Sequence, residues 1–158
     1  MQLKLKITLG ICLCVVNSMG QKTKLVNDPT GTYKLGSKSQ IKDGLQYGYH
    51  GEIKVKKLAT NKIAISFYIC KGAPSSNSGS FVDTLLYENN TAIYRDKYGD
   101  TIKNCTLILM FTKSHISLTE TANYERGTCW GNGVVADGWT YRKVSGKIPV
   151  IKNLLLID

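Results

Sequence analysis

The residues best suited to chemistry in this 158-residue chain gather at positions 128–143, TCWGNGVVADGWTYRK. This stretch holds one cysteine, the tryptophans Trp130 and Trp139, three glycines and a basic end. A glycine loop that binds phosphate requires a strand, a turn and then a helix, but this stretch leads into another strand pattern. We expect a closing hairpin first and a binding lip with one exposed tryptophan second. We do not expect an active site.

Residues that support catalysis are few and scattered. The two histidines are His50, on the polar side of a predicted strand, and His115, in a predicted hairpin turn. No serine lies in a G-x-S-x-G elbow. Glycoside hydrolysis needs two carboxylates that face each other across a cleft. Asp83 and Glu120 lie within strand-like segments, but their spacing does not single them out. We therefore expect no enzymatic activity.

The sequence also lacks the patterns of metal and nucleic-acid sites. Its histidines are isolated, and no C-x-x-C or Cys/His spacing indicates a metal. Single-stranded nucleic acids bind aromatic residues interleaved with basic ones on a sheet face. Tyr47 and Tyr49 lie near lysines. They share the alternating phase of Ile53 and Val55, however, so core packing is the better prediction. We expect no cofactor, no metal and no nucleic-acid partner.

The first 20 residues have the parts of a secretory signal peptide. A short basic start, MQLKLK, precedes the apolar run ITLGICLCVVNSM, and Ser18 and Gly20 are the small residues before a cut at Gln21. The run is shorter than the roughly 20 apolar residues of a membrane span, so we expect no transmembrane segment. Lipidation at Cys12 or Cys14 is the other alternative. We expect cleavage and export, to the periplasm or out of the cell.

Charge and cysteine content describe the exported part, residues 21–158, which has the size of one domain. Loss of Lys4 and Lys6 lowers the formal net charge from +10 to +8. The lysines are scattered singly, so solvated strand faces are favoured over an anionic partner. Three cysteines remain, and in an exported protein two of them are expected to form a disulfide.

We choose Cys105 and Cys129 as this pair. Cys70 follows a strand and precedes a Gly-Pro loop, so it is either a small buried hydrophobe or an exposed thiol. Two glycosylation sequons begin at Asn89 and Asn104. They matter only in a host that glycosylates, and we attribute them to chance.

Apolar and polar residues alternate along most of the chain, which is typical of half-buried strands. The alternating runs are 45–55, 63–69, 81–87, 91–94, 105–111, 116–118 and 139–144. Short polar connections predict hairpins at 59–61, 88–90 and 112–115. No stretch has a convincing helical period. We predict an all-β domain, an antiparallel meander of about eight strands closed into a small barrel, because closure removes exposed edges.

These patterns divide the chain into four parts. We expect a signal peptide at 1–20, a flexible arm at 21–30, the barrel at 31–145 and a C-terminal tail at 146–158. Within the barrel, KGAPSSNSG at 71–79 is rich in Gly, Pro and Ser. It should form an exposed loop.

Four segments carry a resemblance: GTYKL at 31–35, the strand pair and loop within 52–87, CTLILMF at 105–111, and the CWGNG turn with the DGWTYRK strand that follows. Together they resemble small exported bacterial proteins with a calycin-like barrel, which include periplasmic lysozyme inhibitors. The resemblance implies a calycin-like barrel and a disulfide between Cys105 and Cys129. It covers most of 31–144 as a pattern of strands and cysteines.

For function, the resemblance implies a non-catalytic binding module that inhibits a cell-wall lytic enzyme or binds another extracellular protein. Such inhibitors insert a loop with a serine and a basic residue into the enzyme's carboxylate-lined cleft. The corresponding loop residues here are Lys71, Ser75, Ser76 and Ser78. This mechanism needs a filled barrel and a protruding loop.

The alternative is a calycin-type carrier of a small apolar ligand. A carrier needs an interior cavity of about 300 Å³ or more. In this chain residues such as Phe67, Leu107 and Leu109 would line it.

Overall fold

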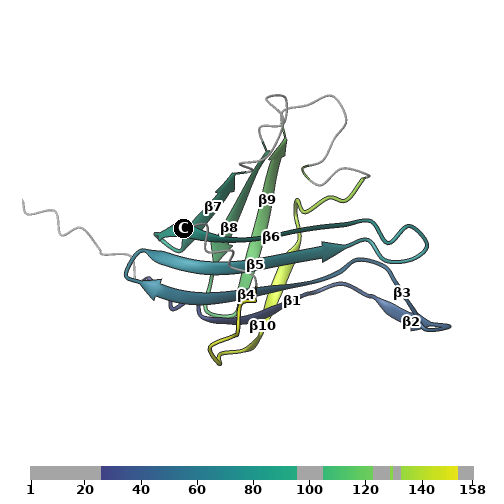
Figure 1. Cartoon of the computed structure of the whole chain (residues 1–158), viewed down its shortest axis with the longest axis horizontal. Coiled ribbons are helices and arrows are strands. Elements are labelled where there is room, and N and C mark those ends of the chain that lie inside the picture. The colour runs from purple at the N-terminus through teal and green to yellow at the C-terminus, as the bar shows by residue number, and fades with distance from the viewer. Residues whose placement is uncertain (1–25, 96–104, 123–128, 130–132, 153–158) are drawn as a thin grey trace, which may run out of the picture.

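The computed structural model describes residues 26–95, 105–122, 129 and 133–152. Within them the chain forms only β-strands: β1 (Gly31–Leu35), β2 (Gln40–Lys42), β3 (Leu45–Tyr47), β4 (His50–Ala59), β5 (Lys62–Cys70), β6 (Ser78–Glu88), β7 (Thr91–Arg95), β8 (Cys105–Phe111), β9 (His115–Ala122) and β10 (Thr140–Ser145). Eight of these strands close into an antiparallel barrel in the order β1, β10, β9, β8, β7, β6, β5, β4 (Figure 1). The predicted all-β barrel is confirmed. The proposed signal peptide lies outside the described residues.

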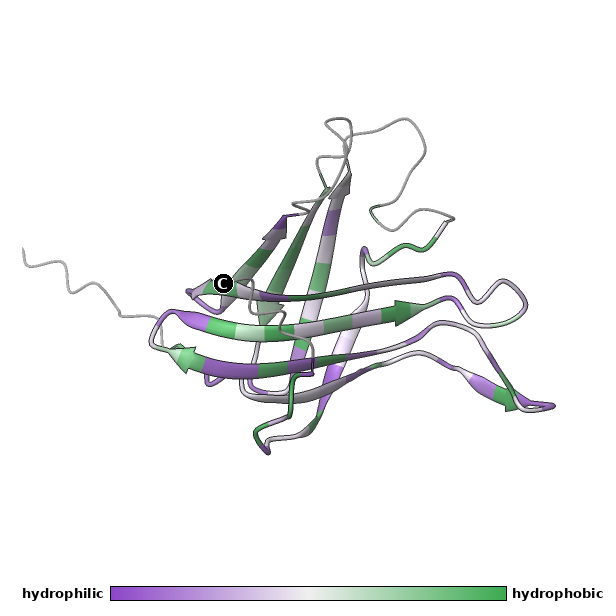
Figure 2. Cartoon of the chain, in the orientation of Figure 1, coloured by the Kyte–Doolittle hydropathy of each residue, from purple (hydrophilic) through white to green (hydrophobic). Residues whose placement is uncertain are grey.

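Inward-facing side chains of alternate residues form the core of the barrel. Along β5, Ile63, Ile65 and Ile69 are fully buried, and the alternation is visible as bands of colour along that strand (Figure 2). Aromatic rings cross the middle of the barrel. The Phe67 ring lies 5.2 Å from that of Phe81, which stacks in turn on another ring of the core. The two-residue period in the sequence thus becomes a packed interior.

The predicted hairpins at 59–61 and 88–90 are confirmed, since they join β4 to β5 and β6 to β7. Asn89 and Asn90 both have positive φ angles, 50° and 62°, which asparagine tolerates better than most residues. The predicted turn at 112–115 is one residue shorter in the structure. His115 is the first residue of β9 and pairs with Arg142.

The run at 45–55 is two strands, where the sequence predicted one. Gly48, with a φ angle of 82°, separates β3 from β4, and β3 pairs with β2 in a small sheet of its own. The prediction that Tyr47 packs in the core is wrong, and so is the inward phase assigned to Leu45. Leu45 is 52% exposed and Tyr47 is 38% exposed, because the β2–β3 hairpin extends past the end of the barrel (Figure 1).

Residues 26–30, the end of the expected arm, are hydrogen-bonded to the barrel. The Asn27 N–H donates to Asn90 Oδ1 (2.6 Å), and the Tyr87 hydroxyl donates to the Asn27 carbonyl (2.9 Å). The Tyr33 hydroxyl donates to the Pro29 carbonyl (2.8 Å). These bonds tie the start of the domain to the β6–β7 hairpin. They also satisfy phenol groups that would otherwise be buried without partners.

The buried tyrosines predict a loss of stability in alkali. Burial raises the pKa of Tyr33 and of Tyr141, and it raises the pKa of Tyr87 to about 12. Because each folded pKa lies above the unfolded value of 10.0, this stability is complete below about pH 10 and is lost as the pH rises toward about 12. We expect the free energy of unfolding in urea to be lower at about pH 11 than at about pH 9.

In the same comparison the Tyr87→Phe variant should lose less stability with pH, because it has one phenol fewer to titrate. Equal stability of the natural chain at both pH values would contradict the buried phenols.

The disulfide between Cys105 and Cys129 is present, with a Cα–Cα distance of 5.3 Å. It ties residue 129 to the start of β8. Cys70 is free and buried, so the first of the two alternatives for this residue is the one found. Its Sγ accepts the Gly72 N–H at 3.4 Å.

Removing the disulfide should destabilise the barrel. The bridge joins residues 24 positions apart, and closing a loop of that length stabilises a fold by about 3 kcal/mol in the chain-entropy model. We expect a Cys105→Ala, Cys129→Ala variant to lose about this free energy of unfolding in urea. A reductant should destabilise the natural chain and leave the double variant unchanged. Equal sensitivity of the two proteins would contradict the pairing.

Candidate functional site

Three segments meet at one end of the barrel and are called the mouth rim here. They are the β2–β3 hairpin (40–47), the loop 71–77 and the segment 133–139. The Ala73 N–H donates to the Gln46 carbonyl at 2.8 Å, which joins the loop to the hairpin. The Tyr49 hydroxyl donates to the Gly133 carbonyl at 3.3 Å, which joins the third segment to β4 and its neighbours. Segments far apart in the sequence therefore form one surface.

The β2–β3 hairpin is the most exposed part of the mouth rim. Its turn is Asp43-Gly44, and both residues have positive φ angles, 51° and 75°. This dipeptide favours a two-residue hairpin turn, and it is the sequence signal by which the hairpin could have been found. All six strand residues are exposed, and Ile41 is 79% exposed. Apolar side chains in such a position favour contact with a partner.

The loop 71–77 folds tightly against the hairpin. Within it the Lys71 N–H donates to the Asn77 carbonyl (2.9 Å), and the Ser76 N–H donates to the Gly72 carbonyl (2.8 Å). Gly72 has a φ angle of 78°, and a Cβ there would lie 2.6 Å from the Gly48 carbonyl oxygen. Only glycine allows this approach. The loop therefore holds the hairpin, which as an isolated two-stranded ribbon would be marginally stable.

The predicted partner-binding residues are all exposed, but they do not all lie in the loop. Lys71, Ser75 and Ser76 belong to it, whereas Ser78 begins β6 and pairs with Cys70. The loop is two residues shorter than the expected 71–79, because β6 extends back over its end. The structure thus brings together one lysine and two serines beside the hairpin.

Of the two tryptophans proposed as a binding lip, Trp139 is half-buried, and Trp130 lies outside the described residues. The Trp139 ring lies 5.1 Å from the Tyr49 ring, and its Nε1–H donates to the Val135 carbonyl at 3.1 Å. Trp139 packs against the barrel core. It anchors the third segment of the mouth rim to the barrel core.

Glu120 organises the third segment, a role that the sequence did not reveal. One carboxylate oxygen accepts the Cys129 N–H at 2.5 Å, and the other accepts the Ala136 N–H at 2.6 Å. The Glu120 N–H in turn donates to Asp137 Oδ1 at 3.0 Å. Glu120 therefore clamps the chain between the disulfide and β10. The other acid considered, Asp83, accepts the N–H of its neighbour Thr84 at 2.7 Å in β6.

The histidines lie apart and bond locally. His50 Nδ1 lies 3.2 Å from the Gly48 carbonyl, and His115 Nδ1 lies 2.9 Å from Thr112 Oγ1. Across the described residues, no three His, Cys, Asp or Glu side chains gather closely enough to hold a metal ion. In the same part of the chain no helix has the length and apolarity to cross a membrane.

The mouth rim carries two lysines, Lys42 and Lys71, and two aspartates, Asp43 and Asp137. Lys42 and Lys71 are exposed, and the ion pair found among the described residues joins Lys54 to Glu52 on β4. Comparisons of the chain with protein-family models, curated proteins and solved structures gave no match.

Replacing Glu120 should loosen the third segment. In a Glu120→Gln variant an amide replaces one charged acceptor, and charge-assisted hydrogen bonds contribute about 1.5–3 kcal/mol. We expect the free energy of unfolding to fall by about 1–3 kcal/mol and hydrogen exchange of the Ala136 amide to quicken. The exposed Glu88 provides a matched control, because Glu88→Gln should change stability by less than about 0.5 kcal/mol. Equal effects of the two substitutions would refute the clamp.

Proposed function

We propose that this chain is an exported, non-catalytic binding module that holds a cell-wall lytic enzyme at the mouth rim and inhibits it. One observation carries the proposal. The β2–β3 hairpin and the loop 71–77 are bonded into a single protrusion. This protrusion presents exposed apolar side chains beside a lysine and two serines.

The apolar part supplies affinity. Ile41, Leu45 and Tyr47 lie exposed on the hairpin, and burial of apolar surface against a partner contributes about 25 cal/mol per Å². A few such anchors carry most of the binding energy of protein interfaces. Because the loop holds the hairpin in place, little ordering is required when the partner binds.

The polar part supplies specificity for acidic groups. The Lys71 ammonium lies beside Gly133 of the third segment, and Ser75 and Ser76 are exposed on the same loop. An ammonium and hydroxyls can satisfy the paired carboxylates of a lytic enzyme's cleft through charge-assisted hydrogen bonds. The exposed Lys42 lies on the hairpin next to the exposed Asp43, so Lys71 is the cation that the proposal depends on. Together with the two serines it matches a catalytic cleft lined with acids.

The packing of the barrel favours this function over a carrier. Phe67, Leu107 and Leu109, the residues that would line a ligand cavity, are at most 1% exposed and belong to the core cluster. The Phe67 ring contacts those of Phe81 and Tyr141, at 5.2 and 6.1 Å. The disulfide is consistent with export, because reducing compartments keep thiols free.

The test is a binding and lysis assay with purified protein from residue 21 and a panel of muramidases. We expect tight capture of a lytic enzyme, with loss of its activity on cell walls. Ile41→Asp should weaken binding at least tenfold, or about 1.4 kcal/mol, because it places a charge in the apolar contact. Lys71→Ala combined with Ser75→Ala and Ser76→Ala should weaken both binding and inhibition.

Matched controls lie away from the mouth rim. Ile148, in the segment after β10, is 71% exposed, close to the exposure of Ile41, and Lys62 is exposed at the start of β5, next to the β4–β5 turn. Ile148→Asp and Lys62→Ala should leave binding unchanged. Failure to capture any muramidase would overturn the inhibitor function. A small apolar molecule found bound by native mass spectrometry would favour the carrier.

A further inference from the structure

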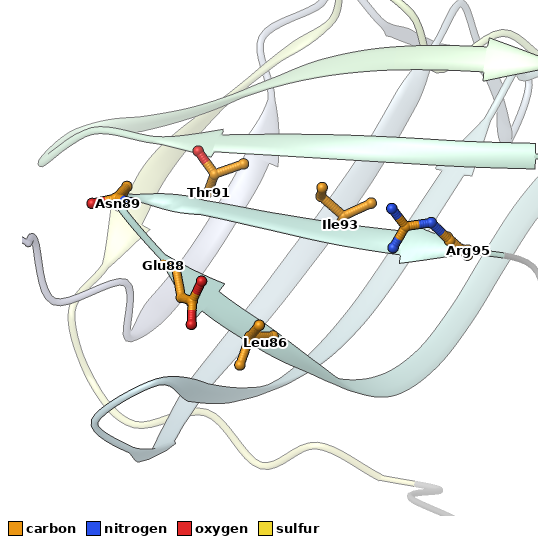
Figure 3. Close-up of a pocket in the computed structure, with 6 residues that line it drawn as sticks. All are labelled: Leu86, Glu88, Asn89, Thr91, Ile93 and Arg95. Carbon is orange, nitrogen blue, oxygen red and sulfur yellow. The ribbon is translucent and has the colours of Figure 1, made fainter.

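The barrel has an open seam between β6 and β7. The 11 residues of β6 pair with β5 at nine positions, but with β7 only at Tyr87↔Ala92 and Glu88↔Thr91. The rest of β7 pairs with β8 alone. Beyond the hairpin the two strands diverge, as Figure 3 shows. The open seam comprises the facing edges of Ser80–Leu86 and Ile93–Arg95.

Backbone groups of β6 face this seam. In an antiparallel ladder, alternate residues direct N–H and C=O to opposite sides. The Tyr87 N–H donates to the Asn61 carbonyl on the β5 side at 2.8 Å. The backbone N–H and C=O groups of the even-numbered residues of β6 therefore point toward β7. These residues are Ser80, Val82, Thr84 and Leu86. No described strand pairs with them on that side.

One of these groups is satisfied by a side chain. The Thr84 N–H donates to Asp83 Oδ1 at 2.7 Å, where a β-ladder would supply a carbonyl. A side-chain acceptor at this position is expected where the neighbouring strand is missing. The hydrogen bond is thus a second sign that the edge is open.

A pocket of about 360 Å³ lies over the seam on the outer surface. It is lined by Leu86, Glu88, Asn89, Thr91, Ile93 and Arg95 (Figure 3). Leu86 and Ile93, which are 53% and 37% exposed, form apolar walls on the two strands. On the inside, the Phe81 and Tyr94 rings stack at 3.8 Å across the seam. The pocket therefore faces outward and is separated from the core.

The pocket has an acidic side chain at one end and a basic side chain at the other. Glu88 lies beside the hairpin, where the strands are paired, and Arg95 lies at the other end of β7, where they diverge (Figure 3). Neither takes part in the ion pair found among the described residues. A complementary segment would place an acidic side chain near Arg95 and a basic one near Glu88.

We propose that the open seam binds an extended segment of a partner polypeptide by β-strand addition to β6. The backbone of that segment pairs with Ser80, Val82 and Leu86, and one of its apolar side chains enters the pocket between Leu86 and Ile93. An extended backbone is the occupant that matches a row of N–H and C=O groups that no described strand pairs with. Side chains on one face of a strand are two residues apart, so the acidic residue lies two positions from the apolar one.

This binding site is separate from the mouth rim. The loop 71–77 precedes β6, whereas the pocket lies at the other end of that strand, by the β6–β7 hairpin. Each site can therefore be tested without altering the other.

The probe is a fluorescent, capped heptapeptide of sequence TETVTKT, which has Glu, Val and Lys on one face. We expect saturable binding below about 1 mM, an affinity normal for a short added strand. Amide exchange of Ser80, Val82 and Leu86, followed by NMR, should slow when the peptide is added. The uncharged peptide TQTVTQT, which offers no ion-pair partner to Arg95 or Glu88 in either strand direction, should bind more weakly.

Two variants separate backbone pairing from side-chain contact. Val82→Pro removes an N–H that faces the seam, a substitution that edge strands tolerate, and it should weaken binding at least tenfold. The matched control Val82→Ala keeps the N–H and should bind within about twofold. Ile93→Lys, which places a charge in the apolar wall, should also weaken binding at least tenfold while the barrel remains folded.

Three results of the peptide and exchange experiments would overturn the proposal. They are no binding at about 1 mM, equal binding by Val82→Pro, and amides of Ser80 and Val82 that exchange as slowly in the free protein as those paired with β5. A free protein that dimerises with protection of the same amides would assign the seam to a second copy, which also overturns it.

Discussion

The closure of the barrel depends on β1, whose short backbone is paired on both edges. Tyr33 and its neighbours pair with β10 on one side and with β4 on the other, so the first strand of the domain joins its last strand to the rest. Gly31 lies against the Ser145 carbonyl, at a φ angle of 149°, where any Cβ would clash. This contact allows the two ends of the sheet to meet. Without β1, β4 and β10 would be open edges.

Closure by strands of unequal length produces the two surfaces of interest. β4, β5 and β6 have 10, 9 and 11 residues, whereas β7 and β10 have 5 and 6. The long strands extend past the short ones, and the connection between β5 and β6 lies near the protruding hairpin at that end (Figure 1). The short β7 cannot pair along the whole of β6. The mouth rim and the open seam are therefore two consequences of one mismatch.

Polar side chains stabilise the barrel where strand pairing stops. Glu120 holds the segment before β10 through two backbone N–H groups, and Asn90 accepts the Asn27 N–H. Asp83 caps the Thr84 N–H at the seam. Buried or edge N–H groups are costly when they lack a partner. These acids and amides thus have a structural role as acceptors of backbone N–H groups. Their spacing in the sequence did not show whether they are structural or catalytic.

The sequence by itself determined the all-β class, the closed barrel and two of the hairpins, because the two-residue period and turn residues act locally. The cysteine count and the resemblance indicated the disulfide, whereas β2 and the break between β3 and β4 were not predicted. The sequence also located Lys71, Ser75 and Ser76 in an exposed loop. The prediction that Leu45 and Tyr47 face the core was wrong. Alternation indicates a strand, but it does not show whether other strands pack over that strand's apolar face. Only the tertiary structure decided that the β2–β3 hairpin contacts the loop 71–77 and that Glu120 binds backbone N–H groups of a distant segment. It also decided that β6 extends beyond its pairing with β7. Each of these depends on register and strand length around a closed sheet, and no local pattern encodes them.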